Sequence, residues 1–175
     1  MISGVVLAAG AATRFGAPKQ HLLLAEVLSR LADSPVDEIV VVEGAYPLEP
    51  CVSVTQGVRV IHCPDWERGP GASLRCGLTS LSPEAEAAVV VLADGPDLAP
   101  EAVSRVIESW RTSGGDVVAA SYGGDRGHPL LVARDVWNEV PDGGLGTRDP
   151  RLVPCDDLGT PGDVDAPNDL PERFR

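Results

Sequence analysis

The fold is decided near the start of the chain, by residues 5–19, VVLAAGAATRFGAPK. The apolar run at residues 5–7 is typical of a buried parallel strand, and it ends in a loop of small residues. Gly10 and Gly16 allow backbone N–H groups of this loop to approach a phosphate closely, because glycine has no Cβ. Two cations, Arg14 and Lys19, lie in the same stretch. We therefore expect the triphosphate of a nucleotide to bind here.

Lys19 is the only lysine among the 14 lysine and arginine residues of the chain. Its ammonium group is a compact point charge, whereas the guanidinium of Arg14 can bind two phosphate oxygens at once. We expect Lys19 to lie exposed in the glycine loop and, with Arg14, to stabilise a departing pyrophosphate. The alternative is a surface lysine without a function. The stretch has neither the Gly-Lys-Ser/Thr of a Walker phosphate loop nor a G-x-G-x-x-G dinucleotide fingerprint.

Three short motifs in this stretch resemble the signature loop of the MobA-like nucleotidyltransferases. The motifs are Leu7-Ala8-Ala9-Gly10, Arg14-Phe15-Gly16 and Pro18-Lys19-Gln20. Within that family the chain looks most like the molybdenum cofactor cytidylyltransferases, because a double alanine before the glycine is typical of the members that use CTP. The resemblance implies that Arg14 and Lys19 are catalytic. It also implies that the nucleotide is bound by Leu7, Ala8, Ala9, Gly10, Arg14 and Lys19.

A second informative stretch runs from Pro64 to Leu78 and has glycine and proline at its centre. We expect a loop here, followed by a helix that begins at Ser73, a good N-cap residue, and buries three leucines (Leu74, Leu78 and Leu81). A similar motif in the cytidylyltransferases, N-P-x-W-x-x-G-x-x-x-S-L-x-x-G-L, closes over the base and ribose. The resemblance adds Ser73 to the nucleotide-binding residues. The capping role and a base contact are compatible, and both stay open.

A carboxylate follows the most apolar strand that the sequence predicts, residues 87–93. Asp94 would lie at the carboxyl end of a central parallel strand, where open α/β sheets bind ligands. Residues 92–96, LADGP, resemble the family's L-A/G-D-x-P motif, and the resemblance makes Asp94 a catalytic residue that binds magnesium. The competing role is a cap for the helix expected near Pro100, for which Asp97 is better placed.

A late acidic segment, residues 163–170 with the sequence DVDAPNDL, resembles the family's D-V-D-T-P-E-D-L motif. The resemblance implies that Asp165 is the second magnesium ligand, opposite Asp94. Without the resemblance, an acidic segment of this kind would be interpreted as a solvated surface.

Residues 126–129, RGHP, resemble a turn of the family that leads into a strand. The resemblance places Arg126 and His128 on the side that receives the acceptor. A histidine can act as a general base, but a phosphate nucleophile is already ionised near neutral pH and needs none, so we expect His128 to have a positioning role. Three departures from the family pattern lie mostly on this side: a short loop after Gln20, Gly95 in place of a larger side chain, and Gly144 in place of an acid.

Strand and helix signals alternate along the whole chain and predict one domain, residues 1–175. The expected fold is α/β, a three-layer α/β/α sandwich with a mostly parallel, Rossmann-like sheet of the nucleotidyltransferase type. The expected helices are residues 21–32, one from Ser73 and one from about Pro100. The expected strands are residues 5–7, 38–43, 58–62, 87–93 and 116–121, and a further one after Pro129.

Composition narrows the classes of partner and location. The net charge of −12 excludes a general affinity for nucleic acid or for an anionic membrane. The four cysteines (Cys51, Cys63, Cys76 and Cys155) have neither C-x-x-C nor zinc-like spacing, so we expect free, mostly buried thiols. No basic leader precedes the first strand and no apolar run has membrane-spanning length, so we expect a cytoplasmic protein.

Together the motifs imply a magnesium-dependent cytidylyltransferase. A phosphorylated small molecule, such as molybdopterin, would attack the α-phosphorus of CTP, and pyrophosphate would leave. Neither the acceptor nor the oligomeric state can be predicted from the sequence. The alternatives are a guanylyltransferase that uses GTP and a nucleotide-binding relative without catalysis. Lys19, Asp94 and Asp165 together argue against the second alternative, because binding alone does not need both acids.

Overall fold

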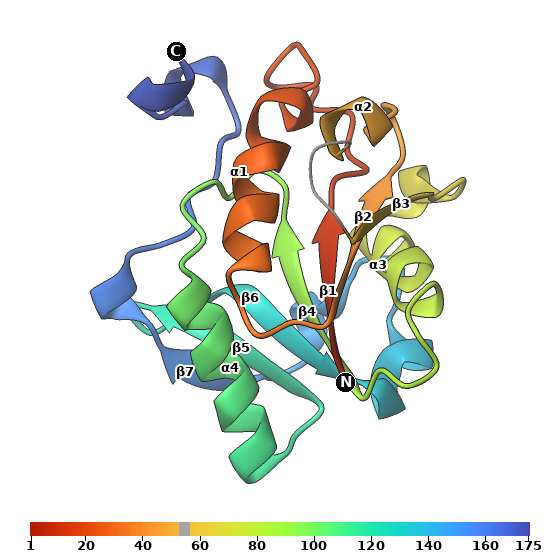
Figure 1. The fold of residues 1–175 in the computed structure, drawn as a ribbon, viewed down its shortest axis with the longest axis vertical. Helices are drawn as coiled ribbons and strands as arrows, with labels where there is room; N and C mark the ends of the chain where they lie inside the picture. The colour runs from red at the N-terminus through yellow and green to blue at the C-terminus, as the bar shows by residue number, and fades with distance from the viewer. Residues whose placement is uncertain (53–56) are drawn as a thin grey trace.

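A single seven-stranded sheet forms the centre of the molecule in the computed structural model, which describes residues 1–52 and 57–175 (Figure 1). The strand order is β3-β2-β1-β4-β6-β5-β7. The strands are β1 (Ile2–Leu7), β2 (Glu38–Glu43), β3 (Val58–His62), β4 (Ala87–Leu92), β5 (Val117–Tyr122), β6 (Asp125–Ala133) and β7 (Arg151–Pro154). The α-helices are α1 (Gln20–Ala32), α2 (Glu49–Val52), α3 (Pro70–Thr79) and α4 (Pro100–Ser113). Short 3-10 helices are η1 (Trp66–Arg68), η2 (Arg134–Glu139), η3 (Leu145–Thr147), η4 (Asp156–Leu158), η5 (Pro167–Asp169) and η6 (Glu172–Phe174).

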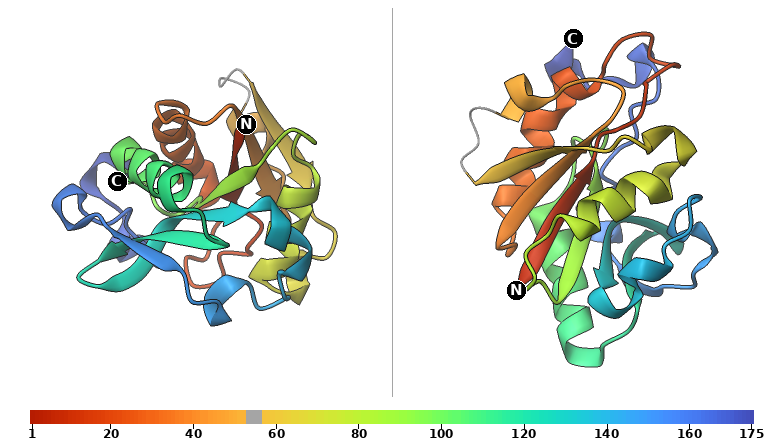
Figure 2. Two further views of the ribbon diagram at one scale, coloured as in Figure 1. Left: turned by 90° about the horizontal axis from the view of Figure 1, so that it is seen from below. Right: turned by 90° about the vertical axis from the view of Figure 1, so that its right-hand side faces the viewer.

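Alternating side chains of the central strands build three layers. Val6 belongs to the apolar cluster formed with α1 and α4, whereas Val5 belongs to the cluster formed with α3 and η2. Successive side chains of a strand point to opposite faces, so an uninterrupted apolar run such as residues 39–42 is buried on both. Figure 2 shows α1 and α4 on one side of the sheet and α3 on the other. The predicted three-layer α/β/α sandwich is confirmed.

The sheet is parallel in four of its six strand pairings and antiparallel where β6 lies between β4 and β5. The mostly parallel sheet is therefore confirmed, but the predicted alternation of strands and helices is wrong after α4. Gly123 and Gly124 have φ values of 62° and 86°, which allow β5 to turn directly into β6. Residues 126–129, predicted as a turn, lie within β6.

Two predicted capping residues do not cap their helices. The helix α3 begins at Pro70, three residues before Ser73, and its N-cap is Gly69 with a φ of 133°. Proline is favoured in the first turn because its φ is already helical, which explains the early start. The N-cap of α4 is Ala99, and Asp97 accepts a hydrogen bond from Arg173 instead.

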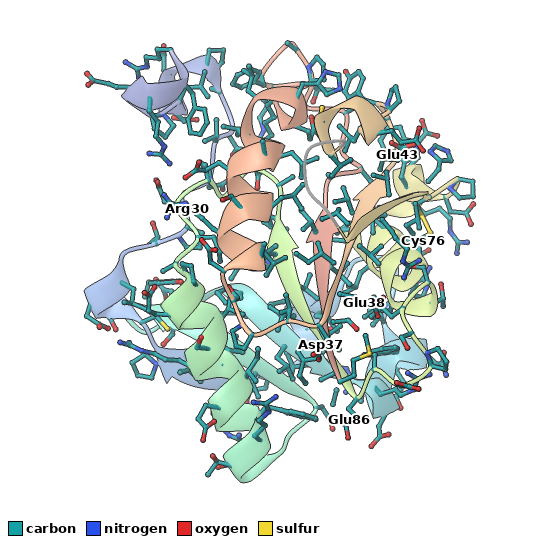
Figure 3. All side chains as sticks on the ribbon, in the orientation of Figure 1. Arg30, Asp37, Glu38, Glu43, Cys76 and Glu86 are labelled. Atoms are coloured by element: carbon teal, nitrogen blue, oxygen red, sulfur yellow. A yellow bond between two sulfur atoms is a disulfide. The ribbon has the colours of Figure 1, made fainter. Side chains whose placement is uncertain are left out.

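The prediction of free thiols is wrong for Cys63 and Cys76, which form a disulfide (Figure 3). Their Cα atoms are 5.8 Å apart although the residues are separated by 13 positions, because the chain after β3 returns alongside the sheet as α3. Their spacing in the sequence carries no signal of this contact. The other two thiols are free, Cys155 being buried and Cys51 half-buried. Among the described residues, no helix combines the length and the apolarity that crossing a membrane requires.

Candidate active site

The carboxyl ends of β1 and β4 meet at one edge of the sheet, because the two strands are parallel neighbours with Leu7 paired to Leu92. Residues 8–19 follow β1, and Asp94 lies two positions after β4. Between them is a cavity of about 240 Å³. Its lining includes seven of the residues predicted from the sequence: Leu7, Ala8, Gly10, Arg14, Lys19, Asp94 and Asp165. The fold therefore brings the loop motif and both predicted magnesium ligands together.

The backbone carbonyls of residues 7–12 all accept hydrogen bonds from other parts of the protein or loop. The donors and their distances are Ala93 N–H to Leu7 (3.1 Å), Gln20 Nε2 to Ala8 (3.4 Å) and Gly10 (2.7 Å), Ala45 N–H to Ala9 (3.0 Å), Tyr46 Oη to Ala11 (3.0 Å), and the N–H groups of Phe15 and Gly16 to Ala12 (3.0 and 3.1 Å). By contrast, the N–H groups of residues 9–14 have no acceptor within the described part of the chain. A row of free amide donors along a cavity is a site for an anion.

Lys19 lies at the start of α1, and its side chain is only 10% exposed. Its Nζ donates to Asp94 Oδ2 at 2.9 Å and to the carbonyl of Val164 at 2.5 Å, and it lies 3.8 Å from Asp165 Oδ1. The predicted exposed position is therefore wrong, because the late segment around Val164 packs against the ammonium group.

Arg14 remains exposed and pairs with Asp165 through two contacts of 2.8 Å. Such a bidentate pair orients both side chains. Each predicted phosphate-binding cation thus contacts a predicted metal ligand.

Three carboxylates gather beside the cavity. Asp94, Asp163 and Asp165 each place one oxygen within 4.8 Å of the others. Burial raises the pKa of Asp163 above its ordinary value, and the negative charges of Asp94 and Asp165 raise it further. Asp94 Oδ1 is buried and has no hydrogen-bond partner among the described residues. Mutually repelling carboxylates with a free oxygen suit a hard divalent cation such as Mg²⁺ or Mn²⁺.

Asp163 is a residue that the sequence-based prediction missed. It lies two positions before Asp165, and Val164 between them is 2% exposed. In an extended segment, side chains two positions apart lie on the same face. The alternation Asp-Val-Asp was therefore the available signal for a second carboxylate on the side of Asp165.

A cavity of about 320 Å³ adjoins the loop on the side of α3. Ala9, Gly10 and Ser73 line it, together with Trp66 and residues 69–70. Ser73 is buried, and the structure places it beside the loop despite its position inside α3. The indole of Trp66 packs against the backbone of Gly44, where a Cβ would lie 2.5 Å from Trp66 Cγ. This wall of the cavity is therefore held close to the end of β2.

The two residues predicted on the acceptor side, Arg126 and His128, line a third cavity of about 430 Å³ that reaches Asp163. Burial, and the nearby charge of Arg126, lower the pKa of His128 to about 4, so this imidazole is neutral at pH 7. Arg126 donates to the carbonyls of Leu145 and Arg148 at 2.8 and 3.0 Å, and burial lowers its pKa. Part of this guanidinium is therefore committed to holding the η3 turn.

The departure at Gly95 has a structural counterpart in the same cavity. A Cβ at Gly95 would lie 3.1 Å from the Cβ of Pro161, so the late segment of residues 160–163 lies close to this position. These residues form one wall of the cavity. A further cavity of about 340 Å³ shares Leu7 and Leu92 with the cavity near Ser73, and Arg126 and His128 with the acceptor-side cavity. The cavities thus adjoin one another along the carboxyl edge of the sheet.

Comparison with known proteins gives a consistent result. The MobA-like NTP transferase domain matches residues 4–152. No curated protein matches the chain significantly. Rv0371c from Mycobacterium tuberculosis H37Rv is 28% identical, with a TM-score of 0.79 over 96% of this chain and 94% of that one. A second crystal structure of Rv0371c, in complex with manganese, has a TM-score of 0.77 at 28% identity over 96% and 95% of the two chains.

A more distant structure shares the fold alone. The CMP:2-keto-3-deoxy-manno-octonic acid synthetase complexed with CTP is 14% identical, with a TM-score of 0.76 over 95% of this chain and 94% of that one. The architecture described above therefore recurs in a protein of very different sequence.

Proposed function

The chain belongs to the family of MobA-like NTP transferases, and on that premise we propose that it transfers CMP from CTP to a phosphorylated small molecule such as molybdopterin. An oxygen of the acceptor phosphate forms a bond to the α-phosphorus of CTP. The bond from that phosphorus to the oxygen bridging to the β-phosphate breaks, and pyrophosphate leaves with the electron pair. Family membership supports the transfer of a nucleotidyl group, and the side chains of the site support the choice of substrates.

The observation that carries the proposal is the convergence of three kinds of group on one cavity. Free loop amides and two cations, Lys19 and Arg14, are suited to the β- and γ-phosphates. The carboxylates that contact these cations are suited to a divalent cation. A protein that only bound a nucleotide would not need a cluster of three acids beside the cations.

The carboxylates present fit a magnesium ion, because they offer hard oxygen ligands and because Asp94 Oδ1 is buried without a partner. We assign Asp94 and Asp165 as ligands, with Asp163 as a third. The relative Rv0371c has been crystallised with manganese, an ion with similar ligand preferences. When bound, the ion neutralises phosphate charge and orients the α-phosphate.

The residues of the chain perform the remaining tasks. Lys19 and Arg14 leave their carboxylate partners for the triphosphate and stabilise the charge that develops on pyrophosphate. His128 is neutral, but an ionised acceptor phosphate carries no proton that a general base would have to remove. The role of His128 is therefore to position the acceptor. Arg126 faces the same cavity and supplies its positive charge.

The preference for CTP over GTP rests on two features. The loop carries two alanines, Ala8 and Ala9, and Ala9 lines the cavity where we place the base and ribose. Ser73 faces the same cavity and is buried, so its hydroxyl can bind a polar edge of the base.

The first experiment is a thermal-shift panel with CTP, GTP, UTP and ATP, each with and without Mg²⁺. A ligand at a hundred times its dissociation constant stabilises the folded state by about 2.7 kcal/mol. We expect the largest shift with CTP and Mg²⁺. A larger shift with GTP would overturn the cytidylyl assignment and favour the guanylyltransferase alternative.

The second experiment measures pyrophosphate release from the triphosphate that binds best, with Mg²⁺ and molybdopterin. Release that depends on both would support the transfer. Tight nucleotide binding without release, with molybdopterin and with other phosphorylated acceptors, would favour the alternative of a nucleotide-binding relative without catalysis.

A further inference from the structure

We infer that Tyr46 and Gln20 are positioning residues, which hold the loop of residues 8–14 with its N–H groups directed at the triphosphate. This inference rests on the proposed function. Neither residue is among those predicted for the site.

Gln20 fixes the loop from the start of α1. It is 4% exposed, and its Nε2 donates to the carbonyls of Ala8 and Gly10 at 3.4 and 2.7 Å. Carbonyl oxygens only accept hydrogen bonds, so the NH₂ group has to face the loop. The other amide atom, Oε1, is buried and has no partner among the described residues. A buried acceptor without a partner is costly, which indicates that the contact to the loop outweighs this cost.

Tyr46 fixes the loop from the side of β2. Its hydroxyl donates to the carbonyl of Ala11 at 3.0 Å. The residues on either side of Tyr46 also make contacts. The N–H of Ala45 donates a hydrogen bond to the carbonyl of Ala9, and the carbonyl of Pro47 lies 3.1 Å from Nε2 of His21. The His21 ring also lies edge-on to the Tyr46 ring, with 6.5 Å between the centroids. Three successive residues therefore connect the loop to the first turn of α1.

The loop needs such support because its backbone is strained. Ala12 has a φ of 50°, a left-handed conformation that is unfavourable for any residue with a Cβ. Without fixed carbonyls the peptide groups of residues 10–12 are free to rotate, and their N–H groups then lose their common direction. A loop built from alanines, with only one glycine between residues 8 and 15, depends on external hydrogen bonds to keep this shape.

This role predicts a selective defect. In the proposed function the β- and γ-phosphates bind to the loop amides, whereas the base binds in the cavity near Ser73. Loss of the hydrogen bonds from Tyr46 or Gln20 should therefore weaken the binding of a nucleoside triphosphate more than the binding of a monophosphate. A substitution that damages the whole site would instead weaken the binding of both ligands equally.

The experiment compares Tyr46→Phe, which removes only the hydroxyl, with the unaltered protein. Isothermal titration calorimetry with Mg²⁺ gives the affinities for CTP and for CMP. We expect Tyr46→Phe to bind CTP about tenfold more weakly and CMP less than threefold more weakly. Gln20→Met, which keeps the length of the side chain, should show the same selectivity, and urea unfolding checks that each variant is folded.

The matched control is Thr79→Val, which also removes a hydroxyl bonded to backbone carbonyls, those of Arg75 and Cys76 at 2.8 and 3.1 Å. It lies at the end of α3 and should leave both affinities unchanged. Unchanged CTP affinity in Tyr46→Phe, or equal losses for CTP and CMP, would overturn the positioning role and leave the proposed function standing. Failure of the unaltered protein to bind any nucleoside triphosphate would overturn the proposed function itself. If another triphosphate binds best, the same comparison is made with it and its monophosphate.

Discussion

Lys19 donates a hydrogen bond to Asp94 at 2.9 Å, so the cation proposed for phosphate binding neutralises an acid proposed for metal binding. Arg14 and Asp165 repeat this relationship through two contacts of 2.8 Å. A divalent cation has to compete with these side chains for the carboxylates, and a triphosphate has to compete for the cations. Metal and triphosphate should therefore strengthen each other's binding. A metal ion on the carboxylates frees the two cations for the triphosphate, and a triphosphate on the cations frees the carboxylates for the metal ion.

Lys19→Met should increase the affinity of the nucleotide-free protein for Mn²⁺ severalfold, because the acid cluster loses one of the two cations that compete with the metal ion, Arg14 being the other. Electron paramagnetic resonance of free Mn²⁺ measures this affinity directly. Turnover should fall in the same variant, because the triphosphate loses a buried positive charge. The matched control is Arg105→Gln, which breaks an exposed pair with Asp157 and should change neither quantity. Weaker Mn²⁺ binding by Lys19→Met would contradict the competition.

The same substitution should also cost stability. An exposed lysine would contribute almost nothing to folding, but Lys19 is 10% exposed and bonded to Asp94. Without Lys19, the carboxylate of Asp94 would have no hydrogen-bond partner among the described residues. We expect the free energy of unfolding to fall by about 1–3 kcal/mol, measured by urea denaturation at pH 7. A cost near zero would mean that the ion pair is not maintained in solution.

Asp94→Asn and Asp165→Asn should each reduce metal-dependent turnover by about a hundredfold or more, while the proteins stay folded. Asn keeps the shape of the side chain but removes the charge that holds the cation. Asp163→Asn tests the carboxylate that the sequence-based prediction missed and should weaken Mn²⁺ binding. Asp157→Asn, at an exposed carboxylate away from the site, is the control. Near-normal turnover in Asp94→Asn or Asp165→Asn would remove that residue from the metal site.

His128 should make stability depend on pH. Its pKa is about 4 in the folded protein and about 6.5 in an unfolded chain. Between these pH values only the unfolded chain binds the proton of His128. The contribution of His128 to the free energy of unfolding is therefore constant above pH 6.5, falls as the pH decreases, and is fully lost below pH 4. The loss from this group is at most about 3.4 kcal/mol. Urea denaturation across this range should give a flatter profile for His128→Asn. An equally steep loss of stability in His128→Asn would contradict this assignment.

The disulfide should stabilise the segment that walls the base cavity. It closes the loop between Cys63 and Cys76, which contains η1 and the start of α3. A closed loop of this length contributes up to about 3 kcal/mol by limiting the unfolded chain. Adding a thiol reductant should lower the urea midpoint of the unaltered protein and leave that of a Cys63→Ser, Cys76→Ser double variant unchanged. A reductant effect of the same size in the double variant would show that it does not arise from this disulfide.

The sequence predicts those parts of the fold that depend on local pattern. The strands predicted at residues 38–43 and 58–62 have the bounds found in the structure. In β2 the signal is the uninterrupted apolar run at residues 39–42, which is buried on both faces of the sheet. The order of motifs also places Asp94 at the carboxyl edge. Gly123 and Gly124 carried a turn signal that went unused, and the hairpin was missed because an antiparallel strand within a parallel sheet looks locally like any other.

What could not be predicted depends on contacts between distant segments. The burial of Lys19 follows from the late segment around Val164, which is 145 positions away in the sequence. The pairing of Cys63 with Cys76 and the contact of Tyr46 with Ala11 arise in the same way. Residue types and local periodicity carry no information on such encounters. The charged residues of the site could thus be predicted from the sequence. The ion pairs that they form with one another could not.

The late segment that supplies Asp163 and Asp165 lies beyond the region matched by the family domain, which ends at residue 152. During synthesis these residues leave the ribosome after most of the sheet-forming strands have emerged. Until then the nascent chain contains the loop, Lys19 and Asp94, but only one of the three clustered acids. The proposed metal site is therefore complete only after residues 163–165 have been synthesised, and a chain released before them lacks two of its three acids.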